Sequence, residues 1–227
     1  MPAEETALEC ARKADEMLRT LRDVKAQALL AIKTTQGTAR AQTRMVVATP
    51  DVFRIEYITL VDGDPHVGVI RADGKTRLES TPAGRKTEGK AIGPDPVSSP
   101  KAIPTGPNLA AAWPTEMSRL VLAGISDRQD VFVQLVNAIT AMPGMKIDCY
   151  RMVDPKRPNS PMYNLAARYP TTNGECELRM TFDGTIGLPV TLQSKVPGKN
   201  GKPVEFFWTA RWQHAVVSLS DVKGKKT

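Results

Sequence analysis

The sequence predicts an α+β fold in which a strongly curved antiparallel sheet, an incomplete β-barrel, is covered by helices. Three observations support this prediction. Apolar and polar residues alternate with a period of two along many short segments, turn-forming pairs separate these segments, and other segments carry apolar residues at helical spacing instead. Over 227 residues, we expect one domain at 4–220 and a basic tail at 221–227.

The first element, a helix over 4–22, is predicted by an apolar stripe opposite charged residues. Ala7, Cys10, Ala14 and Leu18 belong to this stripe, at spacings of three and four. Acidic residues come first and basic residues follow, as the helix dipole favours. An amphipathic helix has to bury its apolar face against another element, and we expect this helix to cover the sheet that follows.

Five strand candidates follow this helix. They are expected at 26–34, 38–48, 52–60, 66–72 and near 75–80. Gln36–Gly37 marks the first turn, although 26–34 also has good helix propensity. Asp62–Gly63 and Asp73–Gly74 mark two later turns.

The strand at 52–60 shows the clearest alternation. Phe53, Ile55 and Tyr57 alternate with Arg54 and Glu56, which puts the apolar side chains on one face and an outward charge pair on the other. After the turn, we expect Val67 and Val69 to continue the same apolar alternation.

Residues 81–108 differ in composition from the segments around them. Six prolines and four glycines fall within this range. Such a density of breakers excludes a helix or a central strand. We therefore expect a loop or lid-like excursion.

Two helices are expected after this excursion. The first, over 109–123, is interrupted by Pro114. The second has an apolar stripe from Val131 to Ile139, begins at a cap formed by Ser126 or Asp127, and ends before Pro143–Gly144. Ordinary packing on the sheet explains both helices, and in a half-open barrel the same packing also covers an apolar cavity.

The remainder of the chain is expected to form strands at 145–153, 162–169, 175–182, 188–196 and 203–213. In the last strand, Phe206, Trp208 and Trp212 share one face. We expect that face to be the concave, helix-covered one, together with Phe53, Ile55 and Tyr57.

The net charge of the chain indicates which classes of partner it can bind. A net charge of +7 suits anionic lipid headgroups or acidic protein surfaces, or simply a solvated surface with a basic tail. The basic residues are dispersed, so nucleic acid is not an expected partner.

The three cysteines, Cys10, Cys149 and Cys176, form no Cys-x-x-Cys pair. A Cys149–Cys176 disulfide is predicted, with three reduced cysteines as the alternative.

No pattern in the sequence indicates catalysis. The two histidines, His66 and His214, have no metal-ligand spacing to another candidate ligand. There is no Gly-x-Ser-x-Gly elbow, His-Glu-x-x-His motif or dinucleotide-binding glycine pattern. We therefore expect a protein that is not an enzyme and has no metal and no cofactor.

Two short motifs resemble a known family. Pro50-x-x-Phe-Arg-Ile-Glu-Tyr57 followed by Val69-Ile-Arg-Ala-Asp-Gly-Lys-Thr76 is similar to the LolA/LolB-like carriers of bacterial lipoproteins, and 178–190 resembles a later strand–turn–strand of that family. Carriers of this family often have an arginine directly before Pro-x-x-Phe that holds a lid closed. Thr49 occupies that position here, so the resemblance implies a divergent member with a different ligand or gating.

This resemblance implies a LolA-like fold and non-catalytic binding or transport of lipids or lipoprotein acyl chains in the periplasm. The alternative is an envelope sensor domain that binds a lipoprotein or a membrane-associated partner protein. Residues 1–5 lack the features of an export signal, so an envelope location requires a signal outside this sequence, and otherwise the chain is expected to be cytoplasmic. The expected apolar pocket lies between the concave face and the helices at 109–141. Its expected lining is Phe53, Ile55, Tyr57, Val69, Met117, Leu120, Phe132, Leu135, Trp208 and Trp212.

Overall fold

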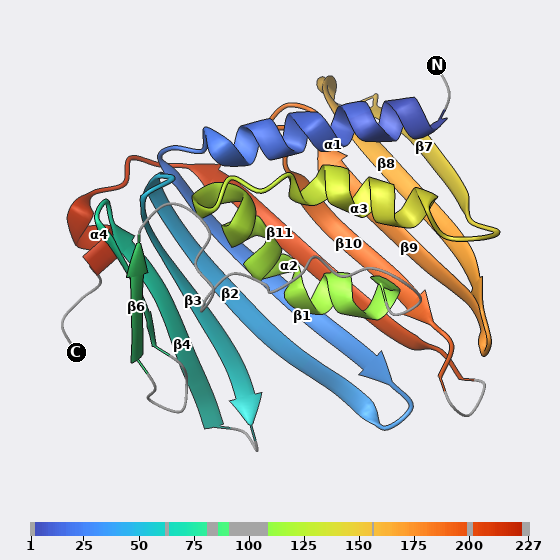
Figure 1. Ribbon diagram of the computed structural model, residues 1–227, viewed down its shortest axis with the longest axis horizontal. Helices are drawn as coiled ribbons and strands as arrows, with labels where there is room; N and C mark the ends of the chain where they lie inside the picture. The colour runs from blue at the N-terminus through green and yellow to red at the C-terminus, as the bar shows by residue number, and fades with distance from the viewer. Residues whose placement is uncertain are drawn as a thin grey trace.

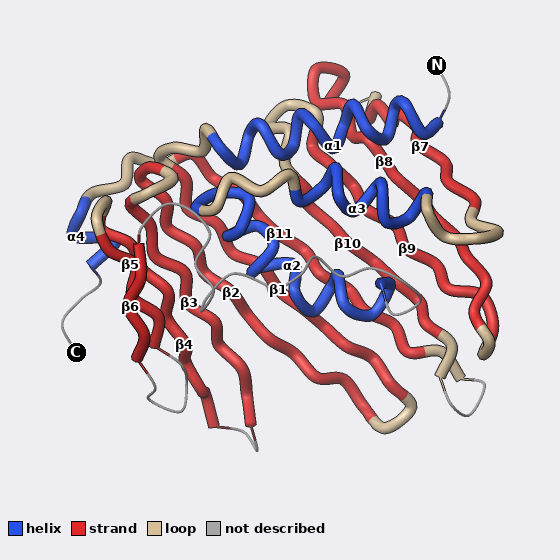
Figure 2. Tube along the Cα trace, viewed as in Figure 1, coloured by secondary structure: helices blue, strands red, loops and turns tan. Residues whose placement is uncertain are grey.

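A single curved sheet with helices on its concave face forms the core of the protein (Figures 1 and 2). The structure, a computed structural model, describes residues 3–61, 64–80, 86–90, 109–155, 157–198 and 202–223. Within these ranges the 11 strands follow the order β6-β5-β4-β3-β2-β1-β11-β10-β9-β8-β7. Every neighbouring pair is antiparallel.

The strands match the predicted segments closely, with one addition at β6. Their bounds are β1 Val24–Thr34, β2 Gly37–Thr49, β3 Val52–Val61, β4 Asp64–Asp73, β5 Thr76–Ser80, β6 Lys86–Lys90, β7 Lys146–Asp154, β8 Arg157–Thr171, β9 Gly174–Asp183, β10 Pro189–Val196 and β11 Val204–His214. The first and second halves of the chain each form one wing of the sheet, and β1 and β11 join the wings.

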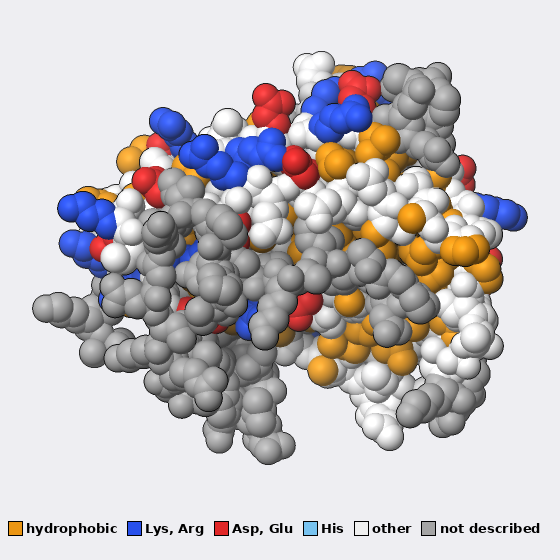
Figure 3. Space-filling view, in the orientation of Figure 1, with side chains coloured by type: hydrophobic (Ala, Val, Ile, Leu, Met, Phe, Trp, Pro, Cys, Tyr) orange, Lys and Arg blue, Asp and Glu red, His pale blue; other side chains and the backbone are white. Residues whose placement is uncertain are grey.

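Three of the four helices in the described chain lie on the concave face. They are α1 Ala3–Arg19, α2 Leu109–Ser126 and α3 Val131–Thr140, whereas α4 Leu219–Lys223 lies beside β2, β3 and β4 (Figure 1). Ala7, Ala14 and Leu18 of α1 are fully buried, as the predicted stripe requires. Hydrophobic side chains gather around α2, α3 and the strands beneath them (Figure 3).

The predicted concave face is confirmed by the strand register. Tyr57 pairs with Thr43, Thr43 with Ala28, and Ala28 with Ala210. Directly paired residues share a face, and the same rows place Phe53, Ile55, Phe206, Trp208 and Trp212 on that side. Arg54 and Glu56 point outward and form an ion pair of 2.7 Å within their own strand.

The expectation for Val67 and Val69 is wrong. Tyr57 pairs with Gly68 and Glu56 pairs with Val69, so both valines lie on the convex face. Ile70 and Ala72 take the concave positions and are 1% and 2% exposed. A shift of one residue in register exchanges the two faces of a strand.

The predicted break at Pro114 is also wrong, because α2 continues through it. Proline cannot donate the backbone hydrogen bond that the Ala110 carbonyl would accept in the next turn. Ser194 Oγ of β10 donates to that carbonyl instead. The sheet therefore satisfies the carbonyl that the proline leaves free.

The predicted cap of α3 comes from a different residue. Ser126 is the last residue of α2, and Asp130 at the start of α3 makes no capping bond through its side chain. Asp15 of α1 accepts the backbone N–H groups of Phe132 and Val133, each at 3.0 Å. One helix thus caps another.

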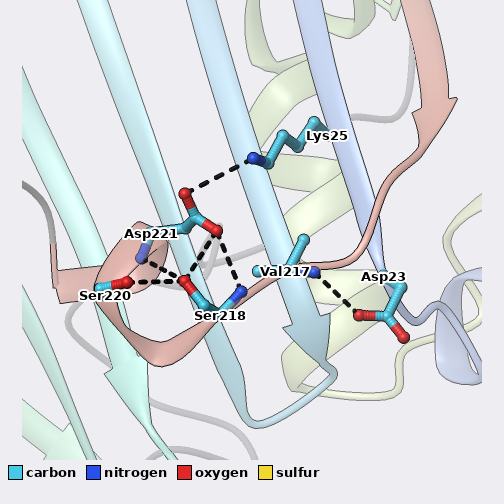
Figure 4. A network of polar contacts seen from close by, with 6 residues as sticks. All are labelled: Asp23, Lys25, Val217, Ser218, Ser220 and Asp221. Atoms are coloured by element: carbon cyan, nitrogen blue, oxygen red, sulfur yellow. Dashed lines mark hydrogen bonds and ion pairs between the residues drawn. The ribbon is translucent and has the colours of Figure 1, made fainter.

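Two expectations at the ends of segments need correction. Within 81–108, residues 86–90 form strand β6 at the edge of the sheet, and the rest of that excursion lies outside the described residues. Residues 221–223, expected in a tail, belong to α4. Ser218 and Asp221 cap this helix reciprocally, through a 3.2 Å bond from Asp221 N to Ser218 Oγ and a 3.0 Å bond from Ser218 N to Asp221 Oδ2 (Figure 4).

The predicted Cys149–Cys176 disulfide is wrong. Cys149 lies on β7 and Cys176 on β9, with β8 between them. Two strand spacings separate their Cα atoms by at least about 9 Å, which exceeds the roughly 7 Å that a disulfide tolerates. All three cysteines are free thiols.

Candidate ligand-binding site

A cavity lies between the concave face of β1–β5 and the first half of α2. Its volume is about 560 Å³, within the roughly 300–1,000 Å³ of typical small-molecule sites. Leu30 and Ile32 of β1, Ala41 of β2 and Trp208 of β11 form much of its apolar lining, and Pro114 of α2 faces them.

Small side chains explain why this end of the sheet is hollow. The concave positions of β2 read Ala39, Ala41 and Thr43 here, whereas Met45 and Val47 follow further along the strand. Met45 and Val47 are 1% and 0% exposed and belong to the packed core. A strand that changes from small to large side chains leaves space at one end and fills it at the other.

Polar contacts hold α2 against the sheet around the hollow. Thr43 Oγ1 and Ser118 Oγ are 2.9 Å apart and join β2 to α2. Further along, Arg77 Nη1 of β5 donates to Ser126 Oγ and Asp127 Oδ1, both at 2.8 Å. The Arg77 and Asp127 side chains are each 1% exposed. These contacts fix the position of the helix that forms one wall.

Two buried donors in the lining have no hydrogen-bond partner in the described structure. They are Tyr57 Oη and Trp208 Nε1, and both residues line the cavity. Burial raises the pKa of Tyr57 well above its ordinary value, so its hydroxyl stays protonated and can donate. An unpaired buried donor is costly, and a ligand oxygen is a partner that both groups can use.

Charged side chains lie at the border of the cavity. Arg119 and Arg40 are exposed, and Glu116 and Glu79 are partly exposed. The positive charge of the Arg119 guanidinium lowers the pKa of Tyr57, but burial raises this pKa by more. The site therefore combines an apolar interior with a charged border.

The structure brings together three of the ten predicted lining residues at this cavity, namely Tyr57, Val69 and Trp208. Val69 borders it from β4, although its register places its side chain on the convex face. Trp212 is half-buried and donates to the Pro189 carbonyl at 2.8 Å. The remaining residues are packed in the core and are at most 1% exposed: Phe53, Ile55, Met117, Leu120, Phe132 and Leu135.

Sequence reasoning missed the small residues that make the cavity. Ala39 and Ala41 drew no attention because an alanine has no recognisable chemistry. A signal was nevertheless present, because residues 37–43 contain no large apolar side chain whereas the neighbouring strands do. Arg119 at the border was missed as well, since it lies on the polar side of a helix that was interpreted only by its apolar stripe.

The described residues contain no cluster of three His, Cys, Asp or Glu side chains that could bind a metal ion. His214 is exposed at the end of β11, as expected. The side chain of His66 lies outside the described residues. In the described part of the chain, no helix combines the length and the apolar character needed to cross a bilayer.

Comparisons by sequence give no match, either to a family model or to a curated protein. Solved structures do resemble the chain. MucB of Pseudomonas aeruginosa, in its complex with MucA, matches at 15% identity and a TM-score of 0.41, covering 92% of this chain and 58% of that one. LprF of Mycobacterium bovis matches at 8% identity and a TM-score of 0.42, covering 94% and 95%. A LolA superfamily protein of Nitrosomonas europaea matches at 8% identity and a TM-score of 0.33, covering 91% and 92%.

The chain therefore spans little more than half of the MucB chain that it matches. The fold expected from the sequence motifs, an open and strongly curved antiparallel sheet covered by helices, is confirmed by the strand pairing of the chain itself.

Proposed function

We propose that the protein is a non-catalytic binder or carrier of an amphiphilic molecule, a lipid or a lipoprotein acyl chain, which occupies the cavity beneath α2. The observation that carries this proposal is an apolar cavity whose lining includes two buried donors without partners, Tyr57 Oη and Trp208 Nε1. Purely apolar filling leaves these donors unpaired, whereas a chain that carries an ester or carboxyl oxygen satisfies them.

The apolar part of the ligand is expected to lie along β1 and β2. Leu30, Ile32 and Ala41 offer it a surface without charges, and the Trp208 ring closes one side. Burial of a methylene group contributes about 0.8 kcal/mol. An acyl chain therefore binds tightly here without any specific polar motif.

The polar part of the ligand is expected near Tyr57 and Trp208. Both groups donate, so the matching group is an oxygen acceptor such as a carboxylate or an ester carbonyl. Arg119 at the border is placed to attract a negatively charged headgroup. The ligand class proposed here is thus an acyl chain attached to an oxygen-bearing, preferably anionic, head.

The resemblance of the sequence motifs to lipoprotein carriers agrees with this proposal. It also supports a location in the bacterial periplasm or cell envelope, where such a molecule is encountered. That location is part of the proposal.

Native mass spectrometry of the protein isolated from its own host tests the proposal. We expect an added mass of a lipid or fatty acid that is lost on denaturation. The variant Ala41→Phe, which places a ring in the cavity, should carry little of it. Protein that is free of any such mass, even after incubation with fatty acid or lysophospholipid, would contradict the proposal.

A protein partner is the second candidate, favoured by strand β7 at one edge of the sheet. Tyr150, Met152 and Val153 of this strand are 44%, 47% and 44% exposed. An extended peptide can add to such an edge through main-chain hydrogen bonds. A photo-reactive residue at Tyr150 should form a cross-link in host cells, whereas one at the exposed Gln193 on the convex face should not. No cross-link at Tyr150 would exclude this candidate.

A further inference from the structure

Cys10 and Cys149 come together although 138 residues separate them in the sequence. Cys10 lies on α1, in the same stripe as Ala7 and Ala14, which are fully buried. Cys149 lies on β7 and pairs with Leu165, which is 1% exposed on the concave face. Helix α1 packs against β7 (Figure 1). The helix stripe and the strand face therefore point toward each other.

The two thiols are close enough to influence each other's ionisation. Contact with Cys149 is the largest cause that lowers the pKa of Cys10, and Lys13, one turn further along α1, lowers it as well. The same contact is the largest cause that raises the pKa of Cys149. The two thiols thus differ in character, and Cys10 is the one that ionises first.

Both thiols are also accessible. Cys10 and Cys149 are partly exposed, whereas Cys176 is buried and pairs with Tyr169 on the neighbouring strand. A small oxidant can therefore reach the first two thiols and not the third. Neither the cavity beneath α2 nor the proposed ligand requires this arrangement.

We propose that Cys10 and Cys149 are a redox pair whose oxidised form joins α1 to β7 through a disulfide. The Cys10 thiolate attacks one sulfur of a low-molecular-weight or protein disulfide and releases one thiolate from it. Cys149 then loses its proton to solvent and attacks the Cys10 sulfur, releasing the second thiolate. The two cysteines lose two protons and two electrons, and the oxidant disulfide is reduced to two thiols.

This bond fixes the helical layer to the edge of the sheet. α1 contacts both α2 and α3, and its Asp15 caps α3. A covalent link at Cys10 thus restrains the helix that organises the other two. Oxidation is expected to strengthen the layer, and reduction to leave it held by noncovalent contacts alone.

Thiol counting after treatment with oxidised glutathione tests the pairing. Intact mass after alkylation should show that the wild type and Cys176→Ala each lose two free thiols, with a Cys10–Cys149 cross-linked peptide in the digest. Cys10→Ser and Cys149→Ser should form no intramolecular disulfide. Three free thiols in the oxidised wild type, or a bond that includes Cys176, would overturn the proposal.

Two further readouts concern the consequences of the bond. The oxidised wild type should unfold roughly 5–15 °C above the reduced protein, because the bond closes a long loop, and oxidation should not shift Cys10→Ser. In the reduced wild type, iodoacetamide should alkylate Cys10 roughly tenfold faster than Cys149, since the thiolate is the attacking species. Equal melting temperatures in the two redox states would contradict the proposed stabilisation of the helical layer. Equal reaction rates of Cys10 and Cys149 would contradict the proposed roles of the two thiols.

Discussion

Two tyrosines on the concave face differ in how their hydroxyl groups are satisfied. Tyr169 Oη accepts the backbone N–H of Ala110 at 3.0 Å, and burial raises the pKa of Tyr169 to about 12. Tyr57 Oη has no partner in the described structure. The first hydroxyl therefore contributes to folding, whereas the second is available for a ligand.

Replacement of these tyrosines by phenylalanine should separate the two roles. Tyr169→Phe leaves the Ala110 N–H unpaired and should lower the free energy of unfolding by about 1–3 kcal/mol. Tyr57→Phe should leave stability within about 1 kcal/mol of the wild type but weaken binding of a fatty acid roughly tenfold. Urea unfolding and a binding titration measure both effects. A large loss of stability in Tyr57→Phe would show that its hydroxyl is structural.

Asp15 links stability to pH. Burial raises the pKa of its carboxyl from 3.8 to about 6, although the bonds from Phe132 and Val133 oppose the shift. Asp130 raises this pKa further, and Arg19 lowers it. The folded protein therefore binds a proton at Asp15 more tightly than the unfolded chain does.

The sign of the resulting pH dependence follows from proton uptake. Between pH of about 4 and 6 the folded state carries more protons at this carboxyl, so this group's contribution to the free energy of unfolding falls as pH rises. The fall is on the order of 2–3 kcal/mol, at about 1.4 kcal/mol for each pKa unit. Asp15→Asn should remove this part of the dependence, as measured by urea unfolding from pH 4 to 7. An unchanged profile would contradict the assignment.

At the scale of elements, sequence patterns located nearly every helix and strand but not the contacts between them. Pro114 predicted a break because the residue that accommodates it, Ser194, lies on a distant strand. The cap of α3 was assigned to Ser126 or Asp127 because caps are usually local, whereas Asp15 supplies it from another helix. Long-range polar partners leave no mark in local periodicity.

The ion pair between Arg77 and Asp127 should be a strong link between elements. It joins β5 to the end of α2, and both side chains are 1% exposed. Asp127→Ala should lower the free energy of unfolding by about 3–5 kcal/mol, because it removes the carboxylate from a buried ion pair. Replacement of both residues by leucine should recover much of this loss. A loss below about 1 kcal/mol in Asp127→Ala, typical of a surface pair, would show that water reaches the site.

At the scale of the whole molecule, one end of the concave face is packed and the other is hollow. The alternation of apolar residues predicted which face of the sheet is concave, but it could not show where side chains of the helices meet that face. Most predicted pocket residues therefore lie in the packed end, with Phe53 and Ile55 among them. The hollow end is set by Ala39 and Ala41, whose small size matters only once the helix above them is in place.

A binding titration with a long-chain fatty acid, compared between two phenylalanine variants, tests the central claim most directly. Ala41→Phe fills the cavity, whereas Ala31→Phe makes the same change on the convex face of the adjacent strand, where Ala31 pairs with Phe207. We predict that Ala41→Phe weakens binding roughly 100-fold, the loss of about four buried methylene groups, and that Ala31→Phe binds as the wild type does. Equal affinity in all three proteins, or no binding in any, would contradict the proposed site.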